Sequence, residues 1–123
     1  MKYTDAFDLN ERVSKIIDVL GMNHINKSRV HCIRSSGSST NRTIARCHTL
    51  SKVLQHSMRT EAFYVIEALS EVFDKMSEEE QTKVLIHELM HIPKTFGGGF
   101  RHHDFVTRRN VDALYRQFFQ SPK

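Results

Sequence analysis

Residues 77–93 read SEEEQTKVLIHELMHIP, and this stretch decides the fold because it predicts one buried helix. Ser77 and Glu80, three positions apart, form a capping box, which is a strong signal for the start of a helix. No glycine or proline interrupts the run until Pro93, which ends it. Aliphatic side chains occur almost all round the predicted helix, as is typical of a helix with little exposed surface.

This predicted helix carries an H-E-x-x-H motif at residues 87–91. His87 and His91 are four positions apart, so their imidazoles extend from one helical face and can bind the same Zn²⁺ ion. Glu88 follows the first of these ligands, where its carboxylate can take a proton from a metal-bound water. Two histidines and a glutamate inside a buried helix are costly unless something binds them, so we expect a metal site rather than ordinary core histidines.

A third protein ligand is expected beyond this helix, because a catalytic zinc site has three protein ligands and leaves the fourth position to water. Residues 97–99 are three glycines, which permit a sharp reversal of the chain. His102 and His103 follow the glycines. The sequence therefore predicts that one of these two imidazoles returns to the metal.

The stretch LIHELMHIPKTF at residues 85–96, with GGFR at residues 98–101, resembles a family of small metallopeptidases of archaea, viruses and phages. This family is related in outline to SprT-like zincins, and the resemblance covers about two thirds of the chain. It implies a zincin fold, a zinc ion and peptidase activity. The family pattern has Arg-Pro-His after the glycine turn, and its histidine matches His103, which favours His103 as the third ligand. A histidine replaces the family's proline at His102, so His102 stays a competitor.

Hydrophobic patterns along the chain predict an α+β fold, with a small sheet backed by helices. The predicted helices cover residues 5–20, 77–92 and 104–119, and the predicted strands cover residues 29–34, 43–50 and 62–72. Asp104 is the expected N-cap of the last helix, and residues 52–58 fit either a short helix or a continuation of the preceding strand. Together with the resemblance, this predicts one minimal zincin-like domain over residues 1–123. Its sheet would pack against the H-E-x-x-H helix and two further helices.

Composition agrees with one small domain. The chain has 123 residues, of which 39% are hydrophobic, and a net charge of +4. No apolar run reaches about 18 residues, and the N-terminus lacks the apolar core of a signal peptide, so we expect a cytoplasmic protein with no membrane partner. The positive charge can attract nucleic acid, but no DNA-binding signature is present and a solvated basic surface is the simpler interpretation. The arginines concerned are Arg29, Arg34, Arg42, Arg46, Arg108, Arg109 and Arg116.

The two cysteines lie on either side of a Ser/Gly-rich loop at residues 35–40. If the flanking strands form a hairpin, Cys32 and Cys47 face each other or nearly so. The simplest interpretation is a pair of small apolar residues on adjacent strands, reduced in an intracellular protein. A second metal site that adds His31 and His48 is a minor alternative, because the spacing is not that of a zinc knuckle.

These observations predict a zinc-dependent peptidase that acts on a protein or peptide, with Glu88 as the general base. In zincins an exposed sheet edge commonly binds the substrate as an extra strand, and here residues 42–50 or 62–69 would supply that edge. Glu67 either orients a ligand histidine or faces solvent. The alternative function is a non-catalytic, zinc-stabilised module that binds nucleic acid or protein. The carboxylate at Glu88 favours catalysis, because a purely structural site has no need of it.

Overall fold

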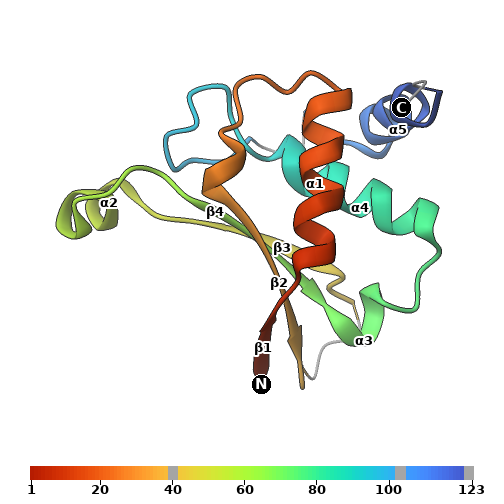
Figure 1. Ribbon diagram of the computed structural model, residues 1–123, viewed down its shortest axis with the longest axis horizontal. Coiled ribbons are helices and arrows are strands. Elements are labelled where there is room, and N and C mark those ends of the chain that lie inside the picture. The colour runs from red at the N-terminus through yellow and green to blue at the C-terminus, as the bar shows by residue number, and fades with distance from the viewer. Residues whose placement is uncertain (39–41, 102–104, 121–123) are drawn as a thin grey trace.

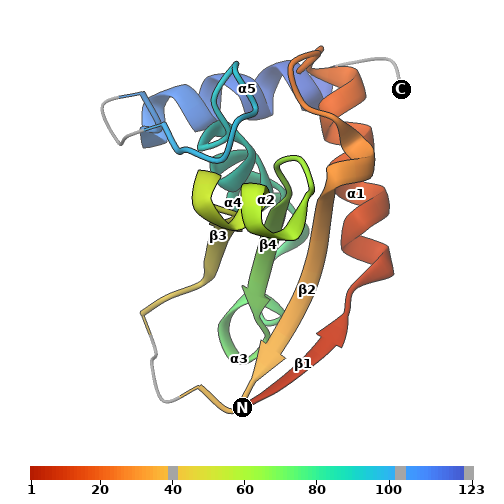
Figure 2. The same cartoon turned by 90° about the vertical axis from the view of Figure 1, so that its left-hand side faces the viewer.

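A four-stranded sheet lies at the centre of the computed structural model, which describes residues 1–38, 42–101 and 105–120. The strands are β1 (Lys2–Asp5), β2 (Val30–Ser36), β3 (Ala45–Thr49) and β4 (Tyr64–Leu69), arranged in the order β1-β2-β4-β3. The central pair, β2 and β4, is parallel, and each outer strand runs antiparallel to its neighbour. Figure 2 shows this order, with β3 and β1 at the two edges.

Helices α1 (Phe7–Val19) and α4 (Glu78–Met90) cover one face of this sheet. The other helices are α2 (Lys52–Met58), α3 (Ser70–Phe73) and α5 (Arg108–Gln120), and a 3₁₀ turn lies at Lys27–Arg29. In Figure 1, α1 and α4 lie beside each other, with α1 packed against β2 and α4 packed against β3. Helix α5 packs on the outer side of α4. The fold is therefore α+β, as the sequence predicts.

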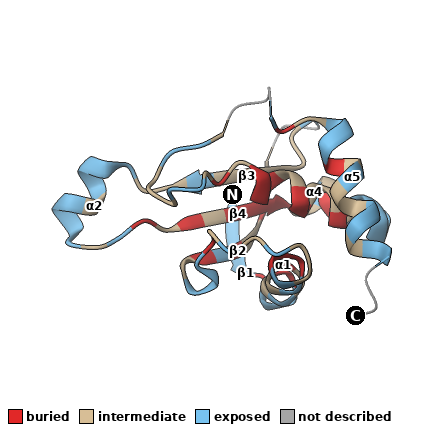
Figure 3. Ribbon diagram, turned by 90° about the horizontal axis from the view of Figure 1, so that it is seen from above, coloured by how far each residue is buried: buried red, intermediate tan, exposed pale blue. Residues whose placement is uncertain are grey.

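Helix α1 forms because its apolar residues recur at helical spacing. Leu9, Val13, Ile16 and Ile17 are all buried in the core, and Gly21, with a φ of +63°, follows the end of the helix. The short helix α2 differs, since none of its residues is buried. Figures 1 and 3 show α2 projecting from the end of the sheet, away from α1 and α4.

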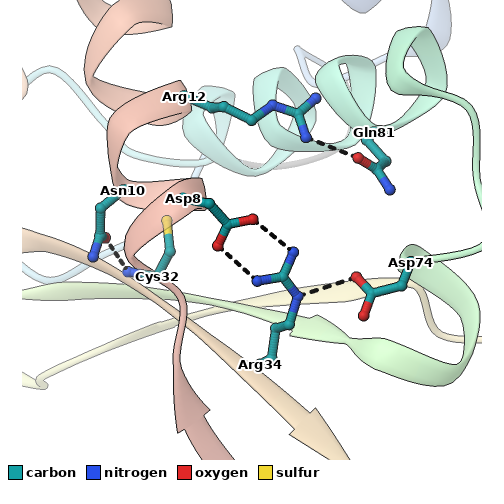
Figure 4. A network of polar contacts seen from close by, with 7 residues as sticks. All are labelled: Asp8, Asn10, Arg12, Cys32, Arg34, Asp74 and Gln81. Atoms are coloured by element: carbon teal, nitrogen blue, oxygen red, sulfur yellow. Dashed lines mark hydrogen bonds and ion pairs between the residues drawn. The ribbon is translucent and has the colours of Figure 1, made fainter.

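A polar network fixes α1 against the sheet (Figure 4). Arg34 of β2 donates two hydrogen bonds to the Asp8 carboxylate of α1, at 2.8 and 3.0 Å. Its Nε donates a third to Asp74, at 3.1 Å, just after α3. Arg12 extends from α1 to α4, where it donates to Gln81 Oε1 at 2.8 Å. These bonds join α1 to β2 and to the helix that carries H-E-x-x-H.

The interpretation that the two cysteines lie on adjacent strands is wrong, because β4 lies between β2 and β3. Cys32 pairs in register with Ile66, and Ile66 pairs on its other side with Cys47. With strands about 4.8 Å apart, the two cysteine Cα atoms are about 10 Å apart, beyond the reach of a disulfide. Both thiols are free, and burial raises the pKa of each to about 12. Strands that follow one another in the sequence usually pair. Here the chain passes from β3 through α2 and returns as β4, which lies between β2 and β3.

The predicted elements need correction or a limit at three further places, and one open alternative is decided. The strand expected to reach residue 72 ends at Leu69, and α3 begins at the next residue. Strand β1 was not predicted, because all four of its residues are exposed and no alternating apolar pattern marks it. The predicted N-cap Asp104 lies outside the described residues; α5 begins at Arg108, and Thr107 Oγ1 accepts a hydrogen bond from the backbone N–H of Asn110. Residues 52–58, which fitted either a short helix or a continuation of the preceding strand, form a helix.

Candidate active site

Helix α4 holds the H-E-x-x-H motif rigidly in the core. Ser77 Oγ accepts a hydrogen bond from Glu80 N–H at 3.1 Å and the Glu80 carboxylate accepts one from Ser77 N–H, so the predicted capping box is confirmed. Leu85, Ile86 and Leu89 have no exposed surface. The side chains of the motif therefore extend from a helix whose position is fixed by packing on the sheet.

The two histidines of the motif lie as one metal ion requires. His87 Nε2 and His91 Nε2 are 3.3 Å apart. Two nitrogens that each bind zinc at about 2.0–2.1 Å with tetrahedral angles are about 3.3–3.4 Å apart, so the observed separation fits a shared Zn²⁺ ion. Among the described residues no third histidine, cysteine or carboxylate joins them to complete a ligand group. The predicted third ligands, His102 and His103, lie outside the described residues.

The ring of His91 is oriented by the chain that returns after the glycines. His91 Nδ1 donates to the backbone carbonyl of Arg101 at 2.8 Å, and Arg101 N–H donates to the His91 carbonyl at 2.7 Å. Because a carbonyl only accepts, Nδ1 carries the proton and Nε2 keeps the free lone pair. The predicted reversal of the chain is thus present, and it ends beside the second histidine. Arg101 is a neighbour that the sequence did not assign to this role.

Glu88 lies beside the two histidines on the sheet side of α4. Its side chain is almost buried, with the residue 7% exposed, and burial raises the pKa of its carboxyl to about 7. A cation bound nearby would favour the charged form and oppose this effect. A nearly dry carboxyl group beside two imidazoles is the arrangement that a general base requires.

A cavity of about 670 Å³ opens beside the motif, between α4, α5 and the chain that leads into β3. His87 and Glu88 both line it. Its apolar lining is Ile44, Ala45, Met76, Val84 and Val111, and its charged lining is Arg42, Glu80, Lys83, Arg108 and Asp112. The sequence does not predict this cavity, because its walls come from segments far apart along the chain.

Glu67 does not reach the histidines of α4. It is adjacent to Ile66, whose side chain faces the helices, so Glu67 points to the opposite face of the sheet. There it accepts hydrogen bonds from Ser35 Oγ at 2.5 Å and His48 Nε2 at 2.7 Å. Glu67 therefore does not orient His87 or His91, and at 3% exposed it does not face solvent.

We predict that Glu67→Gln lowers the free energy of unfolding at pH 7 by about 1–3 kcal/mol, the cost of weakening buried hydrogen bonds. Burial alone raises the pKa of Glu67, whereas the hydrogen bonds from Ser35 and His48 lower it. The hydrogen bonds outweigh burial, so the pKa of Glu67 lies below its usual value. Its contribution is therefore complete above the unfolded-state pKa of about 4.3 and is lost as the pH falls through the lower folded-state value. Urea denaturation at several pH values measures this.

In that experiment the difference between wild type and Glu67→Gln should shrink as the pH falls below about 4. Glu11→Gln, an exposed substitution on α1, serves as the control and should change stability little at any pH. A pH-independent loss in Glu67→Gln would contradict the prediction.

Comparison with known families identifies the chain. The family model described as "Putative phage metallopeptidase" matches residues 1–121. The chain belongs to this family. The match includes the sheet, α4 with its H-E-x-x-H motif and the glycine turn, so family membership and site geometry point to the same helix. Comparison with curated proteins and with solved structures gave no match.

Membership supports a metallopeptidase-like protein that uses a metal ion, and it agrees with the resemblance found in the sequence. Among the described residues, no helix is long and apolar enough to cross a membrane.

Proposed function

We propose that this protein is a zinc-dependent peptidase of the H-E-x-x-H type, related to SprT-like zincins, that cleaves internal peptide bonds. The observation that carries the proposal is the 3.3 Å separation of His87 Nε2 and His91 Nε2 beside the buried carboxyl of Glu88. In this proposal His87, His91 and His103 hold the zinc ion. His102 competes with His103, because either follows the glycine turn directly.

The residues of the chain divide the reaction between them. Bound zinc would supply Lewis acidity, which activates water and polarises the peptide carbonyl. Glu88 accepts a proton from the attacking water and donates it to the leaving amine, so that the amine departs neutral. His91 is held by the Arg101 carbonyl at Nδ1, 2.8 Å away, so that its Nε2 stays beside His87 Nε2, where both nitrogens would bind the zinc.

Substrate binding is proposed at the free edge of β3. The sequence left residues 42–50 and 62–69 as alternatives. Of these two segments, β4 bonds to a strand on each side, whereas β3 keeps an unpaired edge to which an extended peptide can bind. The cavity adjoins the start of this strand, and it would receive a substrate side chain next to the bond that is cleaved. Its apolar walls fit an apolar side chain, and its charged residues would contact the neighbouring residues of the peptide.

A protein substrate fits the structure better than nucleic acid does. Several of the arginines that suggested a basic face lie close to carboxylates of the same chain. Arg34 bonds to Asp8 and Asp74, Arg29 pairs with Glu61 at 3.3 Å, and Arg46 lies 3.8 Å from Glu67. Nucleic-acid binding stays a prediction, testable by the salt dependence of any affinity for DNA.

The experiment that tests the proposed function is elemental analysis combined with peptide digestion. We expect about one zinc per chain, and we expect the protein to cleave a denatured protein into fragments that mass spectrometry identifies. Removal of the metal with a chelator should abolish cleavage, and added zinc should restore it. A protein that binds no metal, or that cleaves equally well without it, would refute the proposal. Bound zinc without any cleavage would support the non-catalytic module instead.

A further inference from the structure

One buried hydroxyl bridges two peptide groups of the glycine turn. Tyr64, the first residue of β4, has no exposed surface, and its ring contacts Phe96 and Phe100, with centroids 5.0 and 6.1 Å away. Its hydroxyl accepts a hydrogen bond from Gly98 N–H at 3.0 Å and donates one to the Gly99 carbonyl at 2.7 Å. The hydroxyl therefore uses both its donor and its acceptor capacity on consecutive residues of this turn.

The same turn is held from its other side by α2. Gln55 Nε2 donates to the Leu50 carbonyl at 2.8 Å and to the Gly97 carbonyl at 3.0 Å. Between these bonds Gly98 has a φ of +101°. A Cβ atom at Gly98 would lie 2.5 Å from the Leu50 carbonyl oxygen and would overlap the Gln55 amide. Only glycine fits this position in the observed conformation of the turn.

This turn ends at the ring of His91. Two residues after Gly99, the backbone of Arg101 makes two hydrogen bonds with His91. The Arg101 carbonyl accepts from the imidazole Nδ1, and the Arg101 N–H donates to the His91 carbonyl. Any movement of the turn would move the Arg101 carbonyl that orients the imidazole. The turn also directly precedes His102 and His103 in the sequence.

We propose that Tyr64 is a positioning residue of the metal site, assisted by Gln55. Its hydroxyl holds the glycine turn so that the Arg101 carbonyl orients the imidazole of His91. This inference rests on the proposed metal site and adds to it two residues outside the H-E-x-x-H motif. Neither touches the two histidines; each acts through the turn.

The test is Tyr64→Phe, which keeps the ring and removes only the hydroxyl. We expect zinc affinity, measured by competition with a chromogenic chelator, to fall about 10-fold, the lower limit for loss of a group that orients a metal ligand. In the metal-free protein we expect faster amide hydrogen exchange at Gly98 and Arg101, because both N–H groups belong to the bonds that the hydroxyl stabilises. Gly98→Ala should show the same two changes, more strongly.

Matched controls separate positioning from a general loss of stability. Val13→Ala removes buried surface on α1 and should lower the melting temperature of the metal-free protein while leaving zinc affinity unchanged. Tyr3→Phe, which removes the hydroxyl of a tyrosine that is 65% exposed on β1, should leave zinc affinity and the amide exchange of Gly98 and Arg101 unchanged. Wild-type zinc affinity in Tyr64→Phe, or equal losses in Tyr64→Phe and Val13→Ala, would overturn the inference. A wild-type protein that binds no zinc would instead overturn the proposed function, which is a distinct result.

Discussion

Glu88→Gln is expected to bind zinc like the wild type and to hydrolyse peptides about 10²–10⁴-fold more slowly. The amide has almost the same shape as the carboxylate, so the packing of α4 is kept, but it cannot accept the proton of the attacking water. The His87 and His91 nitrogens are not altered, and metal binding should persist. Stability should not fall, because the substitution removes the cost of a carboxyl that is only 7% exposed.

The measurement for Glu88→Gln compares kcat/KM on a peptide substrate with the zinc content of the same preparation. Glu79→Gln is the matched control, because Glu79 belongs to the same helix but is exposed and does not line the cavity. Loss of activity in Glu88→Gln with near-normal activity in Glu79→Gln would assign the proton transfer to Glu88. Full hydrolysis by Glu88→Gln would mean that another group is the base.

The helix that carries this chemistry was predictable because its signals are local. The capping box, the uninterrupted apolar run and Pro93 are all contained within residues 77–93, and the helix begins at Glu78 as expected. The spacing of His87 and His91 similarly determines their separation, since positions four apart lie above one another on any α-helix. Neither inference needs knowledge of the remaining chain.

What the sequence could not predict depends on contacts between distant residues. The position of β4 between β2 and β3 follows from which strands pair after the α2 excursion, and no local pattern encodes it. Tyr64 and Gly98 are 34 positions apart, and in the sequence Tyr64 is one of two adjacent aromatic residues, with Phe63, in the predicted strand at residues 62–72. Glu67 has the same limitation, because its partners Ser35 and His48 come from two other strands.

The glycine turn has one feature that the sequence predicts and one that it does not. Three consecutive glycines predict a reversal, and the structure has one, yet only Gly98 has a positive φ among the three. The sequence gives no reason to single it out. The close approach of Gln55 and the Leu50 carbonyl supplies that reason, and both belong to a different part of the chain.

His91→Ala is expected to abolish stoichiometric zinc binding. A site with three protein ligands loses one of them, and the Arg101 carbonyl loses the imidazole to which it is bonded. In the wild type, free zinc at 100 times its dissociation constant should stabilise the folded state by about 2.7 kcal/mol, because zinc binds the folded chain only. Thermal unfolding with and without zinc measures this, and His91→Ala should show no zinc-dependent shift.

His48→Ala is the matched control for His91→Ala. His48 also bonds to another side chain, Glu67, but it lies on the opposite face of the sheet from α4. Its loss should lower stability and leave the zinc-dependent shift intact, whereas loss of the shift in both variants would place the metal elsewhere. The same assay applied to His103→Ala and His102→Ala identifies the third ligand. The variant that behaves like His91→Ala has lost a ligand, and we expect it to be His103→Ala.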